Sequence, residues 1–139
     1  MINFKDGVKP EQIADDLTQV DTQIGFMHDT LKRAVQSYQN HGLSDSRLSA
    51  MLEASVYVTQ KTLLQMENTN HLIASQTLSK PIAVIYGVLF QLEESKHMDT
   101  NKAELSSVLN GLLFIISDVR ITIARITSII EQNNMVNAA

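Results

Sequence analysis

Hydrophobic residues recur along four segments of the chain at alternating spacings of four and three positions. This 3.5-residue repeat places them on one face of a helix and is typical of long helices that pack lengthwise. In a segment of about 10–40 the series is unbroken from Ile13 to Tyr38, and in a segment of about 101–132 it is unbroken from Leu105 to Ile130. The pattern predicts a helix over each segment. For Val119–Ile130, rich in β-branched residues, a strand is the weaker interpretation because of the same repeat.

Two further helices are predicted between these segments. One spans about 45–75, with Ser44 or Ser46 as the N-cap, and the other spans about 79–96, with Pro81 just inside its start. Their hydrophobic series are offset by one residue, so we predict a turn or a sharp kink near Pro81. The two series are Leu52, Val56, Thr59, Leu63, Met66, Asn70 and Ile73, and then Leu78, Ile82, Ile85, Leu89 and Leu92.

The four segments predict an all-α fold with a single domain, residues 1–139. Long antiparallel amphipathic helices would form a four-helix bundle with coiled-coil-like packing, and 133–139 would be a frayed C-terminal tail. Because the third helix is short, the end of the fourth would lack a helix opposite it, and apolar surface there favours self-association. Thr59 and Asn70 either fix the register of the hydrophobic seam or lie at its edge near water.

Composition narrows the classes of function. A chain of 139 residues can bury one core, and zero Cys excludes disulfides, thiolate nucleophiles and cysteine-based metal sites. The net charge of −4, without a cluster of Lys or Arg, argues against a nucleic-acid partner. The first residues contain charges, Lys5, Asp6 and Lys9, where a signal peptide needs its apolar core. This predicts a cytoplasmic protein, while export by a non-Sec route and a location in a virion stay open as alternatives. The longest apolar stretch, 105–117, is too short for integral membrane insertion.

The last predicted helix is the most informative segment. Between Leu105 and Ile130 its only charges are Asp118, Arg120 and Arg125, so we expect it to be buried on more than one side. The alternative is that an irregular bundle covers both sides from within. A partner-binding or oligomer interface is predicted on this helix, with Phe114 and Ile121 opposite the core, whereas Ile115 and Ile129 flank the core series and broaden its stripe. The predicted interface residues are Phe114, Ile115, Ile121, Ala124 and Ile129.

Candidate chemistry is sparse. Glu94 and His97 have the Glu-x-x-His spacing of di-iron bundles, and Glu67 and His71 lie four apart, but a di-iron site needs two such units and two further carboxylates. No nucleotide-binding glycine loop, nucleophile elbow or metalloprotease helix occurs. We therefore predict no catalytic, metal-ligating or cofactor-binding residue, no cofactor and no enzymatic activity. Gly25, Gly87 and Gly111 lie inside helices and are interpreted as sites of close helix packing.

One stretch matches a known motif in part. Ala74, Ser75, Leu78, Pro81, Ile85 and Gly87 fall where the phospho-acceptor box of sensor histidine kinases has the same residues, so 74–87 resembles that box. Gln76 stands where the family has its phosphorylated histidine, and Thr77 replaces the acidic partner. The resemblance implies an inactive, dimerising hairpin made by the third and fourth predicted helices.

The sequence leaves three hypotheses of function. The main one is a non-catalytic interaction or assembly protein that self-associates, or binds a protein partner, through its last helix. The second is a signalling regulator resembling a histidine-kinase dimerisation hairpin that lacks the acceptor histidine. The third is a carrier of a ligand or metal in the bundle core.

Overall fold

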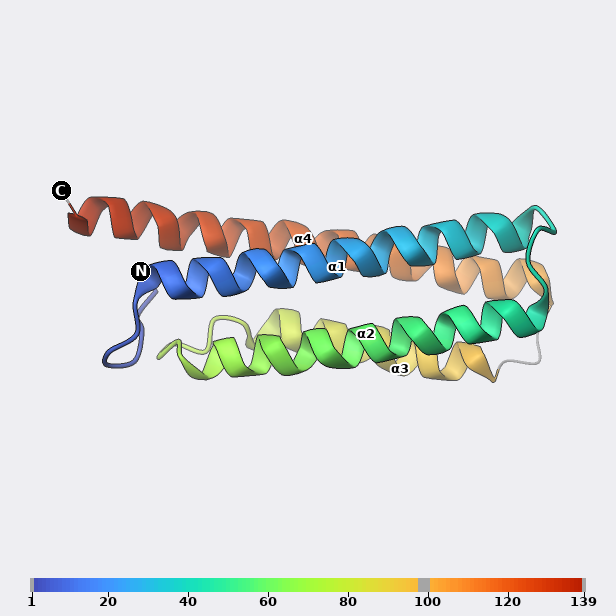
Figure 1. Ribbon diagram of the computed structural model, residues 1–139, viewed down its shortest axis with the longest axis horizontal. Helices are drawn as coiled ribbons and strands as arrows, with labels where there is room; N and C mark the ends of the chain where they lie inside the picture. The colour runs from blue at the N-terminus through green and yellow to red at the C-terminus, as the bar shows by residue number, and fades with distance from the viewer. Residues whose placement is uncertain (1, 98–100, 139) are drawn as a thin grey trace.

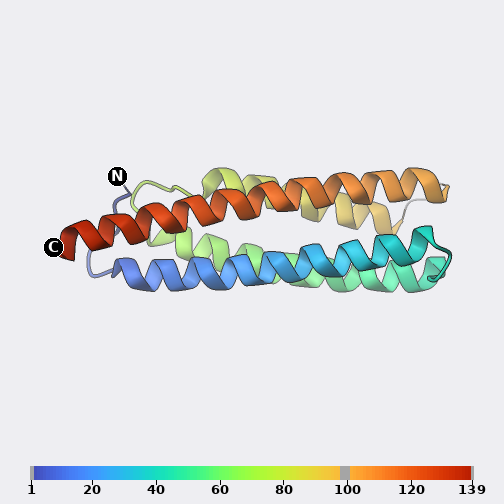
Figure 2. The same ribbon diagram turned by 90° about the horizontal axis from the view of Figure 1, so that it is seen from above.

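The computed structural model describes residues 2–97 and 101–138, with side chains as far as Asn133. In these residues the chain forms four helices: α1 (Pro10–Gln39), α2 (Asp45–His71), α3 (Ser79–Lys96) and α4 (Lys102–Ala138). Each helix packs against the next, and α4 packs back onto α1, so the four close an elongated antiparallel bundle (Figure 1, Figure 2). The predicted four-helix bundle is confirmed.

The hydrophobic seams of α1 and α4 form the core as predicted. Every residue of the hydrophobic series from Ile13 to Tyr38 is at most 4% exposed, and every residue of the corresponding series from Leu105 to Ile130 is at most 7% exposed. In α3 the assignment differs at one position, because Val88 is 1% exposed whereas Leu89 is only partly buried. The prediction of Leu89 as a core residue is therefore wrong, and Val88 takes that place.

The connection between α2 and α3 is organised by Asn70. Its side-chain oxygen accepts a hydrogen bond from the Leu78 N–H (2.9 Å), and its amide nitrogen donates to the Ser79 hydroxyl (3.3 Å). α2 therefore ends at His71 rather than near 75, and α2 and α3 are separate helices joined by 72–78. Asn70 is half-buried and holds this turn, whereas Thr59 is fully buried and donates its hydroxyl to the Ser55 carbonyl of its own helix (2.7 Å).

The first residues of the chain close the end of the bundle beyond α3. The Lys5 N–H donates to the Leu72 carbonyl (3.0 Å) and the Ala74 N–H to the Asn3 carbonyl (2.8 Å), on either side of a β-bridge between Phe4 and Ile73. We call residues 2–9 the N-terminal strap. Ile2, Phe4 and Val8 of the strap pack against the core, which at this end also contains Ile73, Leu78, Ile126 and Ile130.

Two expectations about the last helix are corrected at this end. The core-facing side of α4 is not bare beyond α3, because non-helical residues cover it and Ile130 is only 1% exposed. The helix also continues to Ala138, past the predicted end near 132; no Gly or Pro follows Gly111 to end it. Ala139, the last residue of the predicted tail, lies outside the described residues. The strap and the C-terminal end of α4 lie at the same end of the bundle (Figure 1).

Candidate interaction surface

The side of α4 that faces away from the core exposes large hydrophobic residues. Phe114 is 77% exposed and Ile121 is 51% exposed, and they lie two turns apart on one face. Leu112 and Ile116, on either side of Phe114 in sequence, are buried in the core. α4 thus packs against α1 and α3 through its seam and leaves a second apolar surface facing solvent.

The other three predicted residues lie along the edges of this surface. Ile115 and Ile129 are 41% and 43% exposed, and Ala124 is exposed. Helical geometry places Ile115 and Ile129 on one edge and Ala124 on the other. We call the five residues the α4 face. The face runs about 22 Å along the helix, at 1.5 Å per residue.

Shallow depressions lie beside Phe114 in the seam between α1 and α4. One, of about 220 Å³, is lined by His28 and Lys32 of α1 and by Asn110, Leu113, Phe114 and Ser117 of α4. A second, of about 630 Å³, shares Asn110 and continues toward Gln39 and Lys102. Ser106 lines the second depression, and its buried hydroxyl has no hydrogen-bond partner within the described residues. The α4 face is therefore bordered on its α1 side by a shallow groove that carries two lysines.

Further along α4 than this groove, toward its C-terminal end, a charged contact joins α4 to α1. The Arg120 guanidinium donates to both carboxylate oxygens of Asp21, at 3.0 and 3.1 Å. These bonds raise the pKa of Arg120 above its ordinary value, against the lowering effect of partial burial. The guanidinium lies over Gly25, where an added Cβ would come within 3.0 Å of its central carbon. The close packing expected at Gly25 is thus present, whereas a Cβ at Gly87 or Gly111 would meet nothing within 4 Å.

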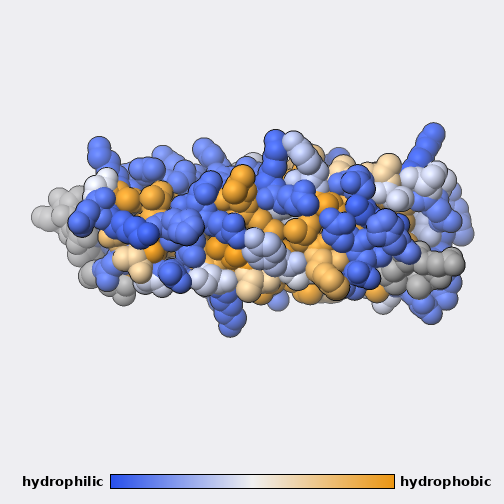
Figure 3. Space-filling model, turned by 90° about the horizontal axis from the view of Figure 1, so that it is seen from below, coloured by the Kyte–Doolittle hydropathy of each residue, from blue (hydrophilic) through white to orange (hydrophobic). Residues whose placement is uncertain are grey.

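The opposite side of the bundle carries a second apolar surface that the sequence analysis missed. It contains Tyr57 and Leu64 of α2 and Tyr86 and Phe90 of α3, and we call it the α2–α3 face. Leu64 is 60% and Phe90 is 62% exposed. Figure 3 shows this side of the molecule, with hydrophobic patches along its middle separated by hydrophilic side chains. Leu64 follows the predicted seam residue Leu63, and Phe90 follows Leu89. Large hydrophobic residues at these positions outside the repeat were the sequence signal for a second exposed apolar surface.

The two tyrosines of the α2–α3 face have polar partners. The Tyr86 hydroxyl donates to the Glu67 carboxylate, and this bond, with burial second, raises the pKa of Tyr86. The Lys61 ammonium lies 4.8 Å from the centre of the Tyr57 ring, within range of a cation–π interaction. These contacts make the α2–α3 face more polar than the α4 face, where Phe114 and the three isoleucines carry no polar atom in their side chains.

The remaining candidate chemistry lies away from both faces. Glu94 and His97 are exposed at the end of α3, and the described residues contain no cluster of three or more His, Cys, Asp or Glu able to hold a metal ion. Gln76, the residue in place of the kinase histidine, lies in the connection with φ +51°. The segment resembling the phospho-acceptor box is thus split between a turn and the first half of α3.

Comparison with known protein families, with curated protein sequences and with solved structures found no match to this chain. Among the described residues, none of the helices has the length and apolar character needed to span a membrane.

Proposed function

We propose that this protein is a non-catalytic interaction protein that docks onto another protein surface, a second copy of itself or a different protein, through the α4 face. The observation that carries the proposal is the exposure of Phe114 and Ile121, at 77% and 51%, on one side of a helix whose other side is buried. Burying a large aliphatic or aromatic side chain contributes roughly 1.5–3 kcal/mol. Two such anchors, flanked by Ile115 and Ile129, give the face the character of an interface core.

The shape of α4 supports the same proposal. A docking surface loses less entropy on binding when it is rigid beforehand, and the Arg120–Asp21 contact and the buried seam fix this helix along its length. The adjoining groove, with Lys32 and Lys102, supplies a polar rim beside the apolar anchors.

The test is the double variant Phe114→Glu with Ile121→Glu. Light scattering at rising concentration measures whether the wild type exceeds the monomer mass of 15.5 kDa, and affinity purification with mass spectrometry finds heterologous partners. We expect the double variant to be monomeric, or to lose the captured partner, with an unchanged circular dichroism spectrum, because neither side chain contributes to the core.

The α2–α3 face offers a matched control. Leu64→Glu with Phe90→Glu replaces two residues of similar exposure, 60% and 62%, on the opposite side of the bundle. This control is expected to keep the assembly or the partner. If the α4 variant keeps its assembly state and its partner, or if only the control loses them, the α4 face is not the docking surface.

A further inference from the structure

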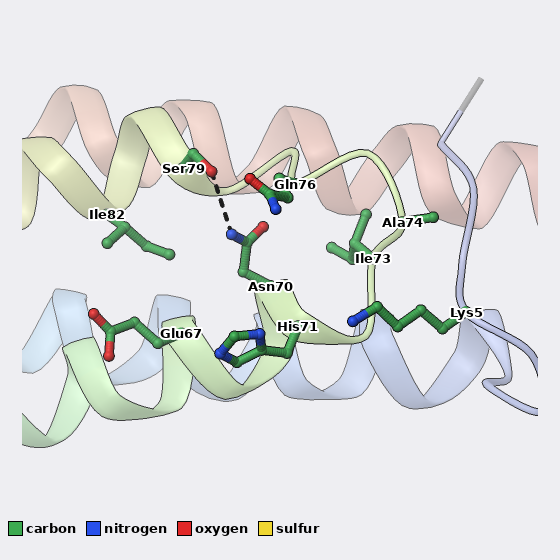
Figure 4. A pocket seen from close by; sticks show the side chains of 9 residues that line it. All are labelled: Lys5, Glu67, Asn70, His71, Ile73, Ala74, Gln76, Ser79 and Ile82. Carbon is green, nitrogen blue, oxygen red and sulfur yellow. Dashed lines mark hydrogen bonds between the residues drawn. The ribbon is translucent and has the colours of Figure 1, made fainter.

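A pocket lies at the end of the bundle that the N-terminal strap closes (Figure 4). Its volume is about 460 Å³, within the range of small-molecule sites. We call it the end pocket. Four segments contribute to its wall: the strap, the last turn of α2, the connection and the start of α3. The lining residues are Lys5, Glu67, Asn70, His71, Ile73, Ala74, Gln76, Ser79 and Ile82.

Three polar side chains of the wall are exposed to solvent and have no partner in the described part of the chain. They are the Lys5 ammonium, the His71 imidazole and the Gln76 amide, each from a different segment. The other polar groups are engaged, because Asn70 binds Leu78 and Ser79, and Glu67 accepts the Tyr86 hydroxyl. Figure 4 shows the Lys5 side chain reaching from the strap toward His71, and the Gln76 amide above them beside Asn70. Each of these groups can donate a hydrogen bond, and the Lys5 ammonium is cationic, while the His71 ring and the Gln76 amide can also accept one.

The backbone at Gln76 is an independent reason to regard the pocket as a site. Its φ of +51° lies in the left-handed region, where glycine is the usual residue and a long side chain is disfavoured. Strained residues of this kind cluster at ligand sites, where the side chain is needed despite the strain. Here the strained position carries an amide into the wall of a pocket that already holds Lys5 and His71.

We propose that the end pocket binds a small organic oxyanion, a carboxylate or a phosphate monoester, that carries an apolar body. Lys5 pairs with the charge, the His71 ring and the Gln76 amide donate hydrogen bonds to it, and Ile73 and Ile82 contact the apolar body. Glu67 adds a negative charge at the side of the pocket toward Ile82, and it disfavours ligands with a second anionic group there (Figure 4).

The strap makes the site depend on the start of the chain. The Lys5 N–H bond to the Leu72 carbonyl, 3.0 Å long, anchors the residue that supplies the cation. A ligand that pairs with Lys5 therefore stabilises the docked strap as well.

The experiment is a titration of the full-length ¹⁵N-labelled protein with benzoate and with phenyl phosphate, followed by NMR. Benzyl alcohol, which has the same ring without the charge, is the neutral control. Saturable shifts at the amides of Lys5, His71 and Gln76 are expected with at least one oxyanion and not with benzyl alcohol. We expect Lys5→Met to weaken binding roughly tenfold or more, and Glu67→Gln to strengthen it. The absence of saturable shifts up to about 10 mM of both oxyanions, or equal shifts with benzyl alcohol, overturns the proposal.

A pair of glycine variants separates binding from turn geometry. Gln76→Gly and His41→Gly relieve the same backbone conformation, because His41 has φ +60° at the opposite end of the bundle. Both variants are expected to be at least as stable as the wild type, and only Gln76→Gly should weaken oxyanion binding. If Gln76→Gly binds as tightly as the wild type, the glutamine serves the turn alone and the proposed donor set is wrong.

Discussion

The ionised form of Asp16, which follows Asp15 in α1, is less favourable in the folded protein than in the unfolded chain. Partial burial, followed by repulsion from Asp15, raises its pKa above the ordinary value of 3.8. A raised pKa means that the stability present below pH 3.8 is lost as the pH rises through the folded-state pKa. We therefore predict that Asp16→Asn, neutral at every pH, unfolds at higher denaturant concentration than the wild type at pH 7.

The size of this gain is expected to be no more than about 0.5 kcal/mol, because Asp16 remains partly exposed. Urea unfolding at pH 7 and pH 3 measures it, and the two proteins should converge at pH 3, where the aspartate is protonated in both states. A gain that persists at pH 3 would assign the effect to packing or helix propensity instead of ionisation.

The exposure of individual residues was predictable where the repeat is strict. Phe114 and Ile121 are predicted opposite the seam of the last helix, and they are exposed. The repeat fails where two hydrophobic residues are adjacent, as at Val88 and Leu89, because spacing alone does not tell which of them faces the core. It also gives no signal for the end pocket, since Lys5 and His71 line the same pocket only because the strap folds back onto the end of α2.

At the scale of helices, the contact between α1 and α4 depends on the missing side chain of Gly25. In a helix interior, replacing Gly by Ala stabilises by about 1 kcal/mol. At Gly25 the new methyl would lie 3.0 Å from the Arg120 guanidinium and displace it from Asp21. We predict that Gly25→Ala gives little or none of this gain in the wild type and about the full gain in an Arg120→Met background.

Gly111→Ala provides the comparison, because a Cβ there meets nothing within 4 Å. It should stabilise by about 1 kcal/mol in both backgrounds when measured by thermal unfolding. Equal effects of Gly25→Ala with and without Arg120 would mean that the guanidinium does not limit this position.

The bounds of the helices could be predicted from local signals where those signals decide them. Pro10 and Ser44 lie at the starts of α1 and α2, and the Arg47 N–H donates to the Ser44 hydroxyl (3.3 Å). The prediction places the end of α2 too late because Asn70 binds Leu78 and Ser79 and the strap bridges to Ile73 from about half the chain length away, and neither contact has a signal in the local sequence. The prediction ends α4 near 132 because the hydrophobic repeat stops there, although the polar residues that follow include neither Gly nor Pro and the helix continues to Ala138.

At the scale of the whole molecule, the strap joins the start of the chain to its middle and closes one end of the bundle. It contributes two backbone hydrogen bonds, Lys5 to Leu72 and Ala74 to Asn3, and the partial burial of Ile2, Phe4 and Val8. Deletion of residues 2–7 removes both hydrogen bonds, at about 1 kcal/mol each, and the apolar contacts of Ile2 and Phe4, at up to about 2 kcal/mol together, but keeps Val8. It is therefore predicted to lower the unfolding free energy by about 2–4 kcal/mol.

The loss should be local before it is global. Hydrogen exchange of the deletion variant is expected to accelerate at 72–78, which lose their pairing, while the turn at 40–44 at the opposite end keeps the exchange rate of the wild type. The core between the ends supports this expectation, because away from the strap the buried seams of α1 and α4 pack against each other and against the other helices. Equal acceleration at both ends would show that the bundle unfolds as one unit and that the strap stabilises all of it; unchanged exchange at 72–78 would show that the strap contributes nothing to closing that end.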